Sequence, residues 1–129
     1  MTSKLQVDSL EGRTTKGSIV VMGESNGKTT NLQQGLAKYW GAGQADGTAI
    51  EDSFNIGSLT DTQAGVQRWN YTNPMNSEEY SAFNSSTAGG GNADTIWNEK
   101  TTTYQDINFH DDSSYADNRS NVGGFGDLA

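Results

Sequence analysis

The sequence predicts a mainly β fold, a small antiparallel β-sandwich with one short α-helix near its N-terminal third and an extended N-terminal segment. Short stretches that alternate apolar and polar residues recur along the chain, separated by clusters of Gly, Asn, Asp, Ser and Thr. Only one stretch spaces its apolar residues as a helix does. With 129 residues, the chain has room for one structural unit with a modest core.

Residues 1–29 are expected to form an extended, strand-containing attachment segment. Leu5 and Val7 alternate with polar residues, which is typical of a short strand with one apolar face. The continuous apolar run Ile19–Met22 indicates a second strand, which we expect to be buried. This run is too short for a signal peptide or a membrane span.

Residues 30–41 are predicted to form the short helix. Leu32, Leu36, Tyr39 and Trp40 follow the spacing i, i+4, i+7 and i+8, which places them on one face of a helix. Thr30 or Asn31 can cap its first turn, and Gly41 suits its C-terminal end. A helix of about ten residues is marginal alone, so we expect this face to supply core or oligomer contacts.

Residues 42–129 are predicted to form the β-sandwich. Residues 53–56 and 67–71 alternate on either side of a turn at 60–65, which indicates a hairpin. Further strands are expected at 79–83, 101–109 and 125–129, with Ile107 and Phe109 sharing one face. Residues 85–92 are expected to form a flexible loop of unassigned role, and 111–121 an acidic loop.

The composition predicts an obligate oligomer. Apolar residues make up 32% of the chain, well below the roughly 45–50% of ordinary globular domains. Three Trp, five Tyr and four Phe nevertheless provide large side chains to bury. A net charge of −8 disfavours binding to nucleic acid or anionic lipid, and the lack of cysteine excludes disulfides and thiol chemistry.

Residues 23–30, between a strand and a helix, resemble the setting of a phosphate-binding P-loop. Only three residues separate Gly23 from Gly27, however, where that motif needs four, and Glu24 would lie beside the phosphates. We therefore interpret the segment as a turn and a helix cap. No cofactor is expected.

Other clusters of charged or polar residues are better explained as exposed surface than as metal or catalytic sites. His110, Asp111, Asp112 and Asp117 lack the spacing of a calcium loop and the ligand number of a zinc site, so we expect no metal. Neighbouring carboxylates at 51–52 and 78–79 point to opposite faces of a strand, which disfavours paired acid–base catalysis. No serine lies in a nucleophile motif, so we expect no enzymatic activity.

Trp69 and Tyr71 lie two residues apart and share one face of a predicted strand. Such a pair can stack on a sugar ring, as in carbohydrate-binding proteins. Two aromatic residues on one strand face are more often part of a core. Core packing is the favoured interpretation of this pair, and sugar stacking is the alternative.

Several segments together resemble short tail-fibre-like structural proteins of marine tailed bacteriophages, of the cyanophage and pelagiphage type. The resemblance covers almost the whole chain and is strongest in its first half. It is carried by residues 3–15, 23–38, 52–61, 69–75 and 126–129.

The resemblance implies a non-enzymatic virion protein made in the host cytoplasm. It implies a homotrimeric tail fibre or fibre tip that takes part in host attachment. Other virion proteins would bind the N-terminal segment, and a host surface glycan is a further possible partner. A capsid-decorating fibre or knob, and a carbohydrate-binding module, are the alternatives. Relatives are more hydrophobic than this chain around Gly123, Gly124 and Phe125, so weak packing of the C-terminal strand is expected here.

Overall fold

The computed structural model describes residues 4–13, 19–22, 29–87, 94–111, 114–115 and 117–129. The chain divides into two units, 1–36 and 37–129, which are described separately here. Predicted features at 14–18, 23–28 and 88–93 lie outside the described residues, and these include most of the P-loop-like segment and of the flexible loop.

The first unit contains a two-stranded ribbon and one turn of helix. Strand β1 (Val20–Met22) pairs antiparallel with β2 (Thr29–Asn31), and α1 (Leu32–Gly35) follows directly. All three residues of β1 are exposed, so the expected burial of this strand is wrong. The predicted strand around Leu5 and Val7 is not formed, because residues 4–7 have no regular secondary structure.

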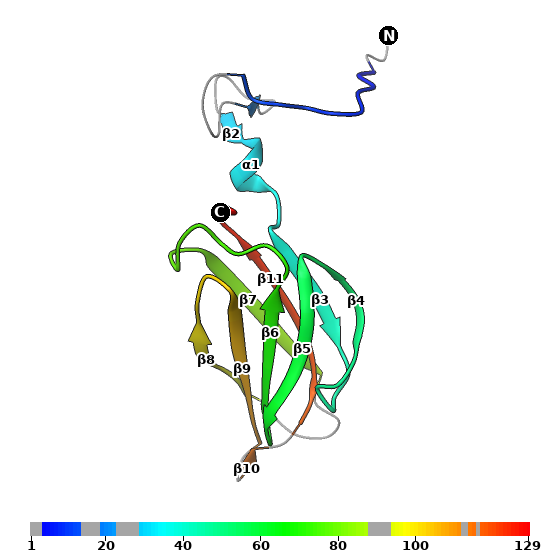
Figure 1. Cartoon of the computed structure of the whole chain (residues 1–129), viewed down its shortest axis with the longest axis vertical. Coiled ribbons are helices and arrows are strands. Elements are labelled where there is room, and N and C mark those ends of the chain that lie inside the picture. Colours follow the sequence, from blue (N-terminus) through cyan, green and yellow to red (C-terminus); the bar gives the residue numbers. More distant parts are fainter. Residues whose placement is uncertain (1–3, 14–18, 23–28, 88–93, 112–113, 116) are drawn as a thin grey trace. The chain divides into compact units, whose positions relative to one another are not determined.

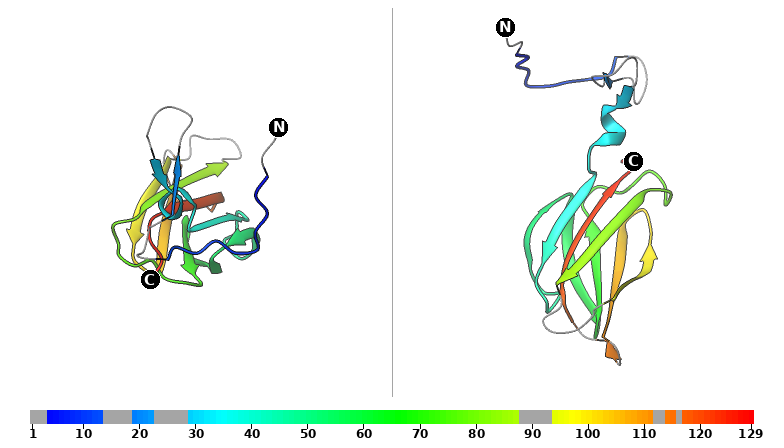
Figure 2. Two further views of the ribbon diagram at one scale, coloured as in Figure 1. Left: turned by 90° about the horizontal axis from the view of Figure 1, so that it is seen from above. Right: turned by 180° about the vertical axis from the view of Figure 1, so that it is seen from behind.

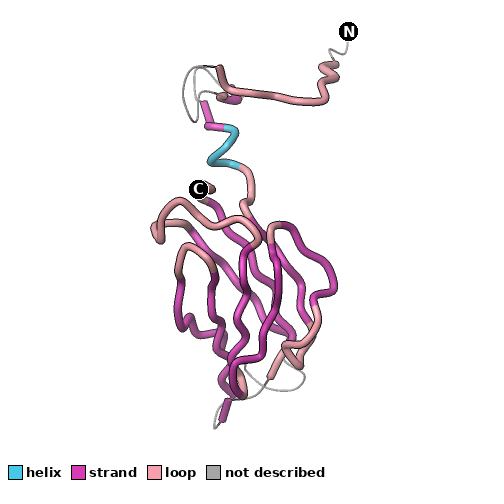
Figure 3. The backbone as a smooth tube through the Cα atoms, in the orientation of Figure 1, coloured by secondary structure: helices cyan, strands magenta, loops and turns pink. Residues whose placement is uncertain are grey.

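The predicted helix over 30–41 is also wrong in its extent, as Figure 3 shows. The side chain of Asn31 caps α1 by accepting a hydrogen bond from the backbone N–H of Gln34 at 3.0 Å. The helix stops at Gly35, and Leu36 is already extended. Glycine is a poor helix former, and the following residues gain ladder hydrogen bonds as a sheet strand instead.

The second unit is a sandwich of two antiparallel sheets, which form the two layers in Figure 1. One sheet has the order β4-β3-β11-β7. Its strands are β3 (Tyr39–Gly43), β4 (Ile50–Phe54), β7 (Ser81–Thr87) and β11 (Arg119–Phe125). The mainly β, sandwich-like prediction is therefore confirmed, and the sandwich already begins at β3.

In the other sheet, β9 lies between β6 on one side and β8 on the other, and β5 pairs with β6. Its strands are β5 (Ile56–Gln63), β6 (Val66–Tyr71), β8 (Asp94–Lys100), β9 (Tyr104–Asp111) and β10 (Ser114–Tyr115). A hairpin is present as β5 and β6, and its second strand was predicted correctly, but its first strand was not: Ser53 and Phe54 end β4 in the other sheet, and residues 60–63, predicted as turn, belong to β5. The turn ends at Gly65, whose φ is 72°. The predicted strand over 101–109 is confirmed in β9.

The chain passes from one sheet to the other at Asn55, between β4 and β5. Asn55 has a φ of 58°, a left-handed conformation that asparagine tolerates better than most residues. Its amide donates to the backbone carbonyls of Lys38 and Asn73 at 3.0 and 3.1 Å and accepts from the N–H of Asn73 at 2.8 Å. These bonds stabilise the corner that sets the two sheets face to face.

The core lies between the sheets and is built mainly around aromatic rings. Its buried hydrophobic members are Tyr39, Ile56, Trp69, Met75, Tyr80, Ile107, Phe109 and Val122. Trp69 is fully buried, and its ring lies so close to Gly41 of the facing sheet that a Cβ there would overlap it. A chain with few aliphatic residues thus fills its interior with rings and leaves room for them with glycines.

The C-terminal strand packs well, contrary to expectation. β11 lies inside its sheet, paired with β3 and β7, and begins within the segment predicted as an acidic loop. Gly124 faces the ring of Tyr39 so closely that a Cβ there would collide with it. The low hydrophobicity of this strand is therefore compensated by the ring that covers it.

Candidate interaction surface

Four aromatic residues lie on the outer face of the β4-β3-β11-β7 sheet. Opposed residues of an antiparallel pair project on the same face, and the register opposes Trp40 to both Phe54 and Gly123. Gly123 is in turn opposed to Phe83, and Phe125 lies two residues beyond it on the same face. We call Trp40, Phe54, Phe83 and Phe125 together the aromatic face. Figure 2 shows this sheet from behind, in its right-hand view.

The rings of the aromatic face are partly exposed to solvent. The exposed fractions are 41% for Trp40, 50% for Phe54, 50% for Phe83 and 39% for Phe125. The rings of Phe83 and Phe125 are 5.8 Å apart between centroids and tilted by 36°. Large apolar side chains that cluster on a surface, unlike isolated ones, mark a site of interaction.

Gly123 allows the aromatic face to form. A Cβ at this position would collide with the ring of Phe83, so only glycine lets that ring lie over β11. The ring in turn buries the backbone of Gly123. The two adjacent glycines of β11 therefore accommodate one ring on each face of the sheet.

No charged side chain interrupts the aromatic face. A carboxylate follows at Asp52, two residues from Phe54 on the same side of β4, and an ion pair between Arg119 and Glu51 lies beyond it. The face therefore lacks the groups needed for acid–base chemistry. It suits apolar contact, or stacking of its rings on a partner.

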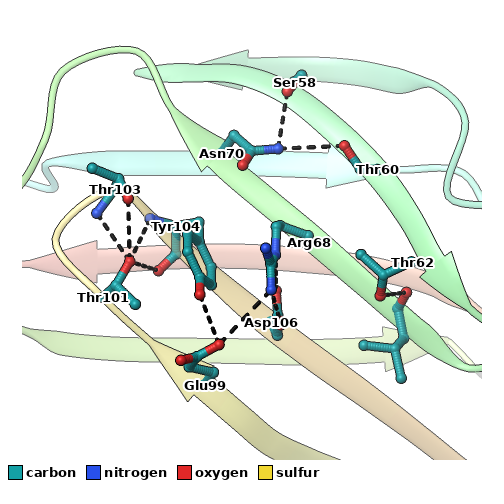
Figure 4. A network of polar contacts seen from close by, with 11 residues as sticks. Ser58, Thr60, Thr62, Arg68, Asn70, Glu99, Thr101, Thr103, Tyr104 and Asp106 are labelled. Atoms are coloured by element: carbon teal, nitrogen blue, oxygen red, sulfur yellow. Dashed lines mark hydrogen bonds and ion pairs between the residues drawn. The ribbon is translucent and has the colours of Figure 1, made fainter.

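The outer face of the opposite sheet has a different character, which Figure 4 shows. Arg68 donates two hydrogen bonds, at 2.7 and 2.8 Å, to the carboxylate of Asp106. Its guanidinium also lies 3.8 Å from the ring centroid of Tyr104. The hydrogen bonds to Asp106 are the main cause of the raised pKa of Arg68. The guanidinium of Arg68, the ring of Tyr104 and the carboxylate of Asp106 thus bind one another.

Neighbouring groups extend this network. The hydroxyl of Tyr104 donates to Glu99 at 2.7 Å, and this bond to a carboxylate raises the pKa of the phenol. On β6, the amide of Asn70 donates to Ser58 at 3.0 Å and to Thr60 at 3.4 Å. Polar groups on this face are thus largely engaged with each other.

Inside the sandwich, three tyrosines form a hydrogen-bonded cluster with Gln105. The Tyr39 hydroxyl donates to the Gln105 side chain at 2.5 Å, and the hydroxyls of Tyr71 and Tyr80 are 2.9 Å apart. Burial raises the pKa of Tyr80 to about 12 and raises the pKa values of Tyr39 and Tyr71 further. All three phenols are therefore held neutral, as donors in a structural network.

The residues predicted to share a helical face do not lie together. Leu32 is half-buried in α1, and Leu36 is exposed after the helix has ended. Tyr39 and Trp40 are consecutive on β3, so they point to opposite faces of the sheet, Tyr39 into the core and Trp40 outward. Only Trp40 belongs to the aromatic face.

The two predicted interpretations of Trp69 and Tyr71 can now be separated. Both residues point to the inner side of β6, where Trp69 is fully buried and Tyr71 packs against the core. Because a buried ring cannot stack on a sugar, Trp69 is a core residue. Tyr71 belongs to the tyrosine cluster.

Asp117 accepts a hydrogen bond from the backbone N–H of Gly65 at 2.8 Å, so it stabilises the hairpin turn. Asp112 and the P-loop-like residues 23–28 lie outside the described residues. Within the part of the chain that the structure describes, no three His, Cys, Asp or Glu side chains are grouped as metal ligands.

Sequence reasoning missed Phe54, Phe83 and Phe125 as surface residues. Each lies in a stretch with the pattern of a strand, and a single aromatic residue in such a stretch predicts a core position. Only the register of four strands, two of them far apart in the chain, brings these rings onto one face of the sheet. The adjacent Gly123 and Gly124 were the available signal, since paired glycines in a strand indicate closely approaching groups.

No protein-family model matches the chain, and no curated protein or solved structure shows significant similarity to it. Among the described residues, no helix has the length and apolar character needed to cross a bilayer.

Proposed function

We propose that this chain is a non-enzymatic structural protein of a tailed-phage virion, a homotrimeric tail fibre or fibre tip that takes part in host attachment. The observation that carries the proposal is the exposure of the N-terminal unit. Its large apolar side chains are at least 50% exposed at Leu5, Val7, Leu10, Val20, Val21, Met22 and Leu36.

Apolar residues exposed over such a segment are costly in water, about 25 cal/mol for each Å² that a partner could cover. A segment that finds no core of its own gains this free energy by binding another protein. We assign this role to the N-terminal unit, which binds a neighbouring virion protein. The compact β-sandwich of residues 37–129 is the part that extends the fibre.

A homotrimer agrees with the composition and with the distribution of apolar side chains. The sandwich buries few aliphatic residues and leaves the four rings of the aromatic face partly exposed. Association of identical copies covers such rings without a second gene product. The resemblance to phage fibre proteins, which are often trimeric, favours three copies over two.

Particle incorporation tests the proposal. In a phage that encodes this chain, a triple substitution V20S/V21S/M22S removes the apolar side chains of exposed β1 and leaves the sequence of the sandwich unchanged. We expect the variant to fold, as judged by circular dichroism, and to be lost from purified particles. The matched control is T60S, at an exposed position of β5. Absence of the wild-type chain from purified particles would contradict the proposal.

Location within the virion separates the fibre from a capsid-decorating fibre or knob. Antibody labelling of particles imaged by electron microscopy distinguishes them, since label at the tail supports the fibre and label spread over the shell supports the knob.

A carbohydrate-binding module is a second candidate, and the half-exposed indole of Trp40 favours it. Indole and phenyl rings exposed on the face of a sheet can stack on sugar rings. A glycan array tests this candidate, with W40A as the binding-deficient variant and W69F as a core control that keeps the surface unchanged. Saturable binding that W40A abolishes would favour it over self-association through the aromatic face.

A further inference from the structure

We infer that the aromatic face is the surface through which copies of this chain associate, with a second copy of the same chain as its occupant. This inference deepens the proposed function, on which its trimeric form rests. It assigns the interface to Trp40, Phe54, Phe83 and Phe125 on the outer side of the β4-β3-β11-β7 sheet.

Charge points to this surface first. A net charge of −8 opposes association of identical copies, and this repulsion is smaller where the surfaces that meet carry few carboxylates. The opposite sheet presents Glu99 and the Arg68–Asp106 pair at its outer face. The aromatic face has no charged residue among its rings, and Asp52 lies only at its margin beside Phe54, so the rings can be covered by a second copy without burial of a carboxylate.

The strand that borders the aromatic face adds a second observation. Edge strands of soluble proteins are usually protected by charges, prolines or bulges, which prevent pairing between molecules. Three of the edge strands here follow this rule. β4 carries Glu51 and Asp52, β5 contains two register shifts, and β8 has a register shift and three charged residues.

Strand β7 lacks all of these devices. Its sequence Ser-Ala-Phe-Asn-Ser-Ser-Thr has no charge and no proline. It pairs with β11 over seven successive residues, Ser81 to Thr87, without a register shift. The β7 edge therefore continues the uncharged surface that begins with Phe83, and both belong to the proposed interface.

The available area suits a specific interface. Aromatic side chains bury about 150–250 Å² each, so four rings that are 39–50% exposed leave roughly 250–500 Å² to be covered. A stable interface takes about 800 Å² from each partner, with an apolar centre and a polar rim. The aromatic face supplies such a centre, and the uncharged side chains of β7 supply part of the rim.

The test compares a carboxylate placed on each sheet. F54E and F83E introduce a charge into the aromatic face, whereas S58E introduces the same charge on the outer face of the other sheet. Molar mass is measured by sedimentation equilibrium on the full chain over a wide concentration range. We expect wild type and S58E to sediment at three times 13.8 kDa. We expect F54E and F83E to sediment as monomers with an unchanged circular dichroism spectrum.

A measurement on the wild-type chain guards against variants that fail to fold. Hydroxyl-radical footprinting, read by mass spectrometry, should show Trp40 and Phe54 at least several-fold less oxidised in the oligomer than after dilution to monomer. Oxidation of Leu5, in the N-terminal unit, should not change.

The outcomes separate the two proposals. A wild-type chain that stays monomeric at all concentrations overturns both the trimer and this interface. A trimer that survives F54E and F83E, with Trp40 unprotected, overturns the interface alone. A dimer that these variants dissociate supports the interface and overturns the threefold count of the proposed function.

Discussion

Replacement of Gln67 by leucine tests how the two sheets are joined. Gln67 is fully buried on the inner side of β6. Its amide nitrogen donates to the backbone carbonyls of Gln44, Ala45 and Asn118 at 3.2, 3.2 and 3.0 Å. Its oxygen accepts from the hydroxyl of Ser120 at 2.6 Å. One side chain thus ties β6 to three other places in the fold.

The magnitude follows from the partners that Q67L leaves behind. A buried polar group without its hydrogen bond costs about 1–3 kcal/mol, and at least the Ser120 hydroxyl and the Asn118 carbonyl lose theirs. Burial of the leucine side chain offsets about 1–2 kcal/mol of this loss. We therefore expect Q67L to lower the free energy of unfolding by about 2–3 kcal/mol.

Urea unfolding followed by tryptophan fluorescence measures the effect of Q67L, at one fixed protein concentration because association contributes to stability. The matched control is Q63L, since Gln63 is exposed at the end of β5. We expect Q63L to lie within about 0.5 kcal/mol of wild type. A loss below about 1 kcal/mol for Q67L would refute the role of this residue as the tie between the sheets.

Three further predictions follow from the core and from the polar sheet face. The folded pKa of Tyr80 is about 12, above the value near 10 of an unfolded tyrosine, so the stability that this residue contributes is complete below about pH 10 and falls by about 3 kcal/mol toward pH 12. Tyr39 and Tyr71, whose pKa values are raised further, add to this loss, so urea unfolding should show a decrease of at least about 3 kcal/mol between pH 10 and pH 12. G124A should destabilise the fold by about 1–3 kcal/mol, because its methyl group overlaps the Tyr39 ring; an unchanged melting temperature would disprove the contact. D106N removes the carboxylate that Arg68 binds and should lower the free energy of unfolding by about 1–3 kcal/mol. The loss should be larger in low salt than in high salt, which thermal melting at several salt concentrations can show.

Strand alternation carried most of the successful predictions. Ile107 and Phe109 were expected to share a face, and both are buried on the inner side of β9. The second strand of the central hairpin was recognised because Trp69 and Tyr71 recur two residues apart between turn residues. These features depend only on local spacing, which a sequence displays directly.

The helix prediction failed because local spacing is ambiguous over short stretches. Leu32, Leu36, Tyr39 and Trp40 fit a helical face, but they also fit one turn of helix followed by a strand. Pairing of β3 with β4 and β11 decides between the two. The pairs between β3 and β11 join residues 77 to 85 positions apart in the sequence, so no local pattern reveals them.

The aromatic face was beyond sequence reasoning for a related reason. Whether Phe54 or Phe83 points inward depends on the register of its strand, and a shift by one residue reverses every side chain. Gln67 was hidden in another way, because the alternation of β6 places it on the core face but its polarity suggests the surface. Three of its four partners are backbone carbonyls, which cannot be predicted from side-chain types.

A high-resolution cryo-electron microscopy map of the purified assembly tests the central claim most directly, since it shows both the number of copies and the surfaces that meet. We predict three copies around one axis, with Trp40 and Phe54 of each copy covered by a neighbour. Copies joined through the Arg68 face, with the rings of β3 and β4 left in solvent, would contradict the account.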